Sequence, residues 1–296
     1  MSKTQDHTAL PQGRDIPILL LGILGIGTSG PLIAKSAMPI PTLIFWRNLA
    51  GSLIMAPFAL RKGEWKNPAH RPAMKVAAIS GIFLALHFIG FFLAMRFTSV
   101  AAGTALTALQ PIFSALYIRY KGGHIARLSL IGMFIAFASV VVITGVDLKL
   151  SVRAFEGDLF AIVCAALAAI YVMIGSKVQS QISTSTYTTI CYGICALTVL
   201  PVIFLTGSRF IAFPKVQWLW LLLLVLGAQL LGHTMFNLSL KRLSPVVVSL
   251  IVFFEVPVAA IVAWIWLHQK PSVGIIPGVI GILIGCSIFV MGRNSK

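Results

Sequence analysis

Charged residues are scarce in this sequence, and acidic ones are the scarcest. Only 10% of the 296 residues are charged, and 7 acids stand against 23 lysines and arginines, for a formal net charge of +16. A soluble domain normally carries about 25% charged residues, so the shortage excludes an ordinary water-soluble globule. The basic excess could suit a nucleic-acid-binding protein, but 58% of the residues are hydrophobic and the mean hydropathy is +0.96. A polytopic membrane protein with no nucleic-acid partner is the class that remains.

Cysteines are few, and the motifs of common enzymes are missing. The four cysteines fall inside apolar runs and form no CxxC pair, so we interpret them as small packing residues. Cys191 and Cys195 share a helix face, but two thiols alone are poor evidence for a metal site. The sequence contains no HExxH, GxSxG or GxxxxGK[ST] motif and no acidic cluster. We therefore predict no enzyme activity, no cofactor and no metal.

Long apolar runs dominate the rest of the chain. A spanning helix needs roughly 20 apolar residues, and a polar tail of 15 residues precedes the first run without a cleavable signal peptide. The longest internal connections are 61–74 and 146–156. We predict an all-α membrane protein with ten transmembrane helices, at 16–35, 41–60, 75–96, 99–118, 126–145, 157–177, 186–206, 216–240, 245–267 and 273–292.

The distribution of basic residues predicts the orientation. With a cytoplasmic N-terminus, 15 of the 23 lysines and arginines lie on the cytoplasmic side, 7 lie outside, and Arg47 lies inside a span. This bias follows the positive-inside rule. We therefore predict a multi-pass protein of the plasma (inner) membrane with both termini in the cytoplasm.

The chain also repeats itself at an offset of 146 residues. Five pairs coincide at this shift, including a rare intramembrane histidine pair: Gly81/Gly227, His87/His233, Arg96/Arg242, Pro111/Pro257 and Gly132/Gly278. Each half holds five spans, and because five is odd the second half must enter the membrane from the opposite side. Such inverted-topology repeats are typical of secondary transporters. The predicted organisation is a tail at 1–15, a first five-helix repeat at 16–145, an outer loop at 146–156, a second five-helix repeat at 157–292 and a tail at 293–296.

Three segments carry a resemblance to a known family. They are Gly27-Thr28-Ser29-Gly30-Pro31 with Phe45-Trp46-Arg47, then Arg96–Gly103 with Gln110–Leu116, and then Lys241–Pro245 with Glu255-Val256-Pro257. The chain resembles the EamA-type transporters of the drug/metabolite transporter superfamily. The resemblance implies a carrier of amino acids, metabolites or drugs, often outward, with a cavity lined by spans 1–4 and 6–9 and with spans 5 and 10 peripheral. A Gly-Glu pair that the family often places after spans 4 and 9 is absent here, so its role is not carried over.

Two charged residues inside spans are candidates for binding or coupling, because charge at membrane depth is costly. Glu255 is predicted to be the only acid inside a span; it could carry a proton, balance a substrate amine or form half of a structural ion pair. Arg47 could grip a substrate carboxylate, pair with Glu255 or extend to the outer headgroups. The pair His87 and His233, expected on opposite sides of the midplane, could line one path or relay protons; the alternative is a structural hydrogen bond.

Neutral polar and aromatic side chains add further candidates. Gln229, His233 and Asn237 share one helix face, and Gln110 lies in a looser polar stripe of span 4; the one-sided spacing favours a lined cavity over simple interhelical bonds. Pro111 and Pro257 predict kinks at that cavity. Trp46 and Tyr171 offer π-faces to an organic or cationic substrate. Small residues of spans 5 and 10 predict close helix packing, more readily within one monomer than across a homodimer.

These residues together predict a secondary transporter of small organic solutes that works by alternating access. Amino-acid-like or amine-bearing metabolites fit best, with outward movement and coupling to protons as expectations. Its partners would be the solute, protons and membrane lipids, and the protein would be a monomer or homodimer. A carrier for multidrug or cationic-compound efflux is one alternative, and a non-transporting membrane sensor or assembly subunit is another.

Overall fold

The structure is a computed structural model that describes residues 13, 15–120, 122, 125–243, 248 and 251–294. The predicted tail before Gly13 lies outside the described residues, and so does most of 244–250, where the predicted ninth span begins.

All regular elements of the described residues are helices. The first half contains α1 (Ile16–Gly27), α2 (Ser29–Lys35), α3 (Ile40–Lys62), the short turns η1 (Glu64–Lys66) and η2 (Pro68–His70), α4 (Arg71–Phe97), α5 (Val100–Thr107), α6 (Gln110–Tyr120) and α7 (Arg127–Leu150). The second contains α8 (Val152–Gln179), α9 (Thr184–Leu205), α10 (Lys215–Leu224), the π-helical η3 (Val225–Thr234), α11 (Met235–Ser239), α13 (Glu255–Leu267) and α14 (Ile276–Asn294).

Length and hydropathy support a multi-pass membrane protein. Within the described residues, seven segments are long and apolar enough to cross a bilayer: Ile16–Lys35, Ile40–Lys62, Pro68–Phe97, Val100–Tyr117, Val152–Gln179, Thr184–Leu205 and Lys215–Ser239. The same part of the chain contains three shorter apolar helices, Arg127–Ile143, Glu255–Leu267 and Ile276–Phe289. They occupy the places of predicted spans 5, 9 and 10. The all-helical class is confirmed, whereas the count of ten spans stays a prediction.

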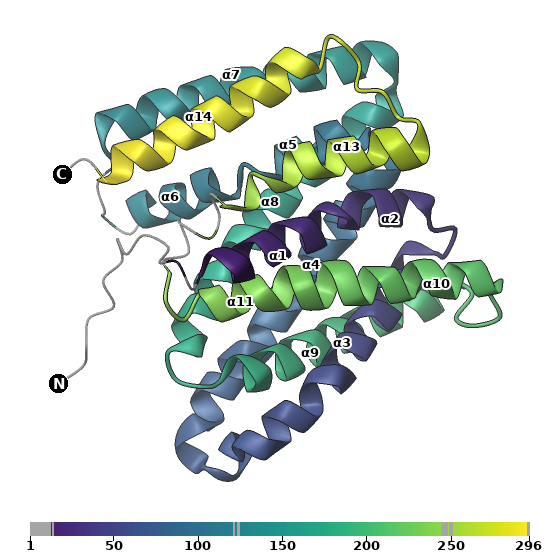
Figure 1. The fold of residues 1–296 in the computed structure, drawn as a ribbon, viewed down its shortest axis with the longest axis vertical. Helices are drawn as coiled ribbons and strands as arrows, with labels where there is room; N and C mark the ends of the chain where they lie inside the picture. Colours follow the sequence, from purple (N-terminus) through teal and green to yellow (C-terminus); the bar gives the residue numbers. More distant parts are fainter. Residues whose placement is uncertain are drawn as a thin grey trace.

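The contacts between helices have the exchange symmetry expected of two inverted repeats. Two contacts join a helix to its own counterpart at the offset of 146, α3 to α9 and α7 to α14, and a third, α5 to α13, joins parts of the corresponding predicted spans 99–118 and 245–267. The extensive contact of α4 with α8 has its counterpart in the contact of α1 with η3. Figure 1 shows α7 and α14 side by side at one edge of the bundle, and α3 and α9 at the other. A pseudo-twofold axis between the halves explains this pattern.

Prolines interrupt three of the predicted spans. α5 ends at Thr107 and α6 begins at Gln110, and a turn at Phe253–Phe254 precedes α13. Pro111 and Pro257 lack the N–H that would bond the carbonyl one turn earlier, which explains both breaks and fits the predicted kinks. Pro31 does the same in the first span, where α1 and α2 meet at Thr28.

Small residues bring α7 and α14 into backbone contact. A Cβ atom on Gly285 would meet backbone atoms of Gly132 and Ala136, and one on Gly278 would meet Ser139 and Ile143. The small residues of these helices therefore permit close packing within one chain, as predicted.

Two predictions near the middle of the chain are wrong. The connection expected at 146–156 is almost entirely helical, because α7 continues to Leu150 and α8 already begins at Val152. Asp158, at the edge of the predicted span 157–177 and expected among the acids of the outer loops, lies in α8 with none of its surface exposed. Gly157 packs against the backbone of Phe97 and Thr98, and this close approach buries the next residue. Glu255 is therefore not the only acid inside a helix of the bundle.

Candidate functional site

A central cavity lies between the two halves of the chain. The empty space between its lining atoms measures about 650 Å³, including the part open to solvent. The first half lines it from α1, α2, α4, α5 and α6, and the second from α8, η3, α11, α13 and the segment before α13. None of the lining residues that the structure describes comes from α7 or α14, as expected, and none from α3 or α9, which the resemblance had placed at the cavity.

Six of the nine residues predicted to bind or couple line this cavity: His87, Gln110, Tyr171, His233, Asn237 and Glu255. The other three are Arg47, Trp46 and Gln229, and they lie elsewhere in the bundle.

Glu255 and Gln110 lie within one residue of corresponding positions in the two halves. Each is the first residue of a helix that begins beside a break, Glu255 in α13 and Gln110 in α6. Only 6% of the Glu255 surface and 8% of the Gln110 surface is exposed. A helix N-terminus carries a partial positive charge that favours a carboxylate nearby. The break before α13 thus gives Glu255 a polar environment inside an apolar bundle and aims it at the cavity.

The two histidines are direct neighbours, and their placement on opposite sides of the midplane stays a prediction. Their ring centroids are 6.4 Å apart, with the planes at 69°. Nδ1 of His87 lies 3.1 Å from the carbonyl oxygen of Cys164. Phe91 stacks on His87 with centroids 6.1 Å apart, and Phe88 meets His233 edge-on at 5.1 Å. The pair therefore forms one aromatic wall that draws on both halves.

Tyr171 and Asn237 form a polar part of the lining next to His233. Nδ2 of Asn237 donates to the Tyr171 hydroxyl oxygen at 2.6 Å and to the carbonyl oxygen of His233 at 2.9 Å. Nε2 of Gln179 donates to Oδ1 of Asn237 at 3.4 Å. The Tyr171 ring lies 6.5 Å from the His233 ring. These bonds fix the orientation of the amide and present the phenol ring to the cavity.

Arg47 is fully buried outside the cavity. Its Nε donates to Oε1 of Gln229 at 2.6 Å, and Nε2 of Gln229 donates to Oδ1 of Asn48 at 3.2 Å. The guanidinium lies over the Phe88 ring, with Cζ 4.3 Å from the centroid. Among the described residues, its two terminal nitrogens have no hydrogen-bond partner and no salt bridge joins it to Glu255. Gln229 is thus a partner of the arginine rather than a cavity residue.

Trp46 of α3 contacts the connection between α9 and α10. Its Nε1 donates to the carbonyl oxygen of Phe210 at 2.9 Å, and its ring lies 5.2 Å from Phe210 and 5.7 Å from Trp218. The preceding segment is held in the same way, because Thr42 donates to the carbonyl oxygen of Arg209 at 2.8 Å. In this structure the indole therefore anchors the connection between α9 and α10.

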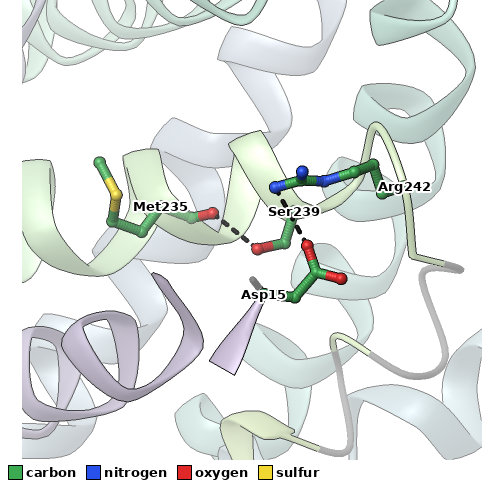
Figure 2. A network of polar contacts seen from close by, with 4 residues as sticks. All are labelled: Asp15, Met235, Ser239 and Arg242. Atoms are coloured by element: carbon green, nitrogen blue, oxygen red, sulfur yellow. Dashed lines mark hydrogen bonds and ion pairs between the residues drawn. The ribbon is translucent and has the colours of Figure 1, made fainter. Parts of the chain in front are cut away.

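An ion pair joins the two halves at the end of the bundle where α1 begins. Nη2 of Arg242 lies 3.0 Å from Oδ1 of Asp15, whose side chain is only 4% exposed (Figure 2). Ser239 donates to the carbonyl oxygen of Met235 at 3.0 Å beside it. The sequence analysis had assigned Asp15 to a polar tail and missed this role. Arg242 coincides with Arg96 at the offset of 146. This coincidence was a sequence signal that both arginines hold helix ends in place.

Arg96, the repeat counterpart of Arg242, makes similar contacts at the opposite end of the bundle. Its Nη2 donates to the carbonyl oxygens of Ser36 and Met38, between α2 and α3. Gln217, at the start of α10, accepts from the backbone N–H of Ala37 at 2.8 Å. Both repeat-related arginines therefore tie neighbouring helix ends together, one at each end of the bundle.

Metal binding has no support among the described residues, where no group of three or more His, Cys, Asp or Glu side chains could hold an ion. The four cysteines are buried and unpaired.

Comparisons with known proteins agree on the class. The EamA-like transporter family model matches the chain twice, at 14–145 and 155–291. The chain is similar to an uncharacterized transporter of Archaeoglobus fulgidus, with 26% identity over 78% of this chain and 80% of that one. It is also similar to the uncharacterized transporter YxxF of Bacillus subtilis, with 24% identity over 94% of this chain and 90% of that one. A crystal structure shares the fold with a TM-score of 0.67, at 16% identity over 97% of this chain and all of the other.

Proposed function

The chain belongs to the EamA-like transporter family, and on that premise we propose that it carries small amine-bearing organic solutes, amino-acid-like ones among them, across the plasma (inner) membrane. The observation that carries this proposal is a buried carboxylate, Glu255, at a cavity built from both repeats. A carboxylate in such a place favours a cationic group of the solute, because an unpaired buried charge is costly.

The other lining residues narrow the solute class. The rings of His87, Phe91 and Tyr171 offer flat apolar faces, and Tyr171 can also contact a cation with its π-face. Asn237 and Gln110 supply amide groups that can hold a carboxylate or hydroxyl of the solute. No lysine or arginine stands among the described lining residues. Phosphorylated solutes, which need several cations, therefore fit less well.

Alternating access follows from the exchange symmetry of the helix contacts. Two related bundles that meet at one site can rock against each other and expose it to either face. The Asp15–Arg242 pair and the Arg96 contacts hold opposite ends of the bundle. Opening toward either face would break the contacts at that end while those at the other end hold, with the solute leaving the cell in the exporting direction. The proposed topology keeps ten spans and cytoplasmic termini.

The proposal also includes coupling of transport to protons through Glu255. Protonation would remove the charge that holds the amine, so proton and solute would compete for one carboxylate. Exchange of an incoming proton for an outgoing cationic solute follows from such competition.

The decisive experiment is transport by the purified protein in liposomes. Amino acids, polyamines and cationic drugs are offered with and without a pH gradient. We expect saturable flux of amine-bearing compounds that the gradient drives, and its loss in Glu255→Gln. Glu156→Gln, which alters an exposed acid of α8, is the matched control. Failure of every compound to move, or to protect against thermal unfolding, would contradict the proposal.

Two alternatives remain distinguishable in the same assay. Broad flux of unrelated cationic drugs, without selectivity for small amines, would indicate a multidrug efflux carrier. Ligand protection without flux would indicate a non-transporting sensor or assembly subunit.

A further inference from the structure

A second hollow lies on the flank of the bundle and shares no lining residue with the central cavity. It runs between α3, the start of α9 and the η3–α11 segment, and the empty space between its lining atoms measures about 1090 Å³, including open solvent. Its wall is apolar, with Ile54 and Phe58 of α3 facing Leu238 of α11. Ile54 and Phe58 are 41% and 52% exposed. In a membrane protein such exposed apolar side chains face the acyl chains of the bilayer.

One end of this groove is polar and cationic. Lys62, in the last turn of α3, and Lys241, which follows α11, both line it. Burial lowers the pKa of the Lys241 ammonium, and although Glu64 opposes this, Lys62 lowers it further. Two ammonium groups of like charge therefore face one hollow, and an anion between them would relieve their repulsion.

The nearby acid is already committed to another contact. The Glu64 carboxylate accepts hydrogen bonds from the backbone N–H of Ser183, at 2.9 and 3.0 Å, and from the Ser183 hydroxyl at 2.7 Å. These bonds hold it at the N-terminus of α9, where a negative charge is favourable. Glu64 thus offsets part of the positive charge but does not occupy the groove.

Thr184 gives an independent observation that points to a ligand. Its side chain lines the groove at the cationic end and is 6% exposed. Among the described residues, its hydroxyl oxygen is buried without a hydrogen-bond partner. Burying a hydroxyl without a partner destabilises the folded state, so a group that accepts its hydrogen bond would stabilise the structure.

We propose that this groove binds one anionic phospholipid. The phosphate lies between Lys62 and Lys241 and accepts a hydrogen bond from Thr184, and an acyl chain follows Ile54, Phe58 and Leu238. A lipid fits better than a soluble phosphate because the cationic end continues directly into an apolar wall on the lipid-facing flank. Both lysines belong to the predicted cytoplasmic side, where anionic lipids attract basic residues.

The test uses the full-length protein purified in a neutral detergent. Native mass spectrometry and the thermal unfolding midpoint are measured with dioleoylphosphatidylglycerol, dioleoylphosphatidylcholine and glycerol 3-phosphate. We expect one phosphatidylglycerol to bind tightly and to raise the midpoint. In Lys62→Gln/Lys241→Gln its affinity should fall about thirtyfold, because each lysine near an anionic lipid contributes roughly a fivefold factor. Thr184→Val, which keeps the shape but removes the hydroxyl, should weaken it about tenfold.

The matched control is Lys75→Gln/Lys177→Gln, which removes two exposed lysines of the same predicted side that do not line the groove. It should bind phosphatidylglycerol as the unaltered protein does. Equal binding of phosphatidylcholine, equal stabilisation by glycerol 3-phosphate, or an equal loss in the control pair would each overturn the proposal. If the double variant at the groove fails to fold, the single variants Lys62→Gln and Thr184→Val decide the question.

Discussion

His87 and His233 are 146 residues apart in sequence, and their rings lie 6.4 Å apart in space. Residues that a twofold axis exchanges can be in contact only where they lie close to that axis. The histidine pair therefore marks the pseudo-twofold axis between the two repeats, and the cavity that both rings line lies on it. A site on the axis stands in the same relation to both halves, which is the geometry that alternating access needs.

Glu255→Gln tests the role of the buried carboxylate. Gln keeps the size of Glu but cannot bind a cation by charge, and a hydrogen bond to a charged group contributes about 1.5–3 kcal/mol. We expect the apparent affinity for an amine-bearing solute to fall by about tenfold or more, and the dependence of flux on pH to disappear. Initial rates in proteoliposomes between pH 5.5 and 8.5 provide the measurement. Unchanged rates and an unchanged pH profile would remove Glu255 from the mechanism.

Gln229→Leu and Arg47→Met separate a structural role of Arg47 from a role in binding. Gln229→Leu leaves a fully buried guanidinium without the acceptor at 2.6 Å, so we expect a loss of about 1.5–3 kcal/mol in unfolding free energy. Arg47→Met removes the charge as well, and replacing a buried charged group by an apolar one is often tolerated. Thermal unfolding of both variants should therefore rank Gln229→Leu as the less stable. If Arg47→Met is instead the less stable variant and also loses solute binding, Arg47 takes part in substrate binding.

Glu64→Gln tests the contact between the η1 turn and α9. Partial burial raises the pKa of Glu64, but hydrogen bonds from Thr186 and Ser183 outweigh it and hold the pKa below the ordinary value. A carboxyl group with a depressed pKa stabilises the fold above its unfolded-state pKa of about 4.3, and this contribution is lost as the pH falls through the lower folded-state pKa.

The expected effect at neutral pH is a drop of roughly 1–2 °C in unfolding midpoint for Glu64→Gln, because the group is partly exposed. The difference between variant and unaltered protein should shrink as the pH falls below about 4. Midpoints recorded from pH 3 to pH 7 check this, with Glu156→Gln as the control. A difference that grows toward low pH would contradict the assignment.

Gly285→Ala tests the backbone contact of α7 with α14. The added Cβ would meet backbone atoms of Ala136 and Gly132, which cannot move aside as a side chain can. We expect a loss of about 1–3 kcal/mol in stability with solute affinity unchanged, because no described residue of either helix lines the cavity. The adjacent Ile284→Ala, at a side chain that is 50% exposed, is the control and should unfold close to the unaltered protein.

Local patterns predicted the parts of the fold that local interactions decide. Pro111 and Pro257 predicted helix breaks because a missing N–H acts within one turn, wherever the helix is packed. The glycines of the last span predicted close packing because only a residue without a side chain permits it. Asp158 was misplaced for the complementary reason: its burial depends on Gly157 meeting Thr98, an interhelical contact that the sequence of α8 does not contain.

The sequence by itself determined the class, the repeat and a pool of polar residues inside the bundle, because hydropathy and a fixed offset are properties of the chain alone. Only the tertiary structure decided which of those residues meet. In the structure, one cavity is lined by Glu255, Tyr171 and Asn237. Gln229 accepts a hydrogen bond from Arg47, and Asp15 forms an ion pair with Arg242. Helical periodicity says which residues share a face, whereas the partner of that face depends on how each helix is rotated and shifted against its neighbours.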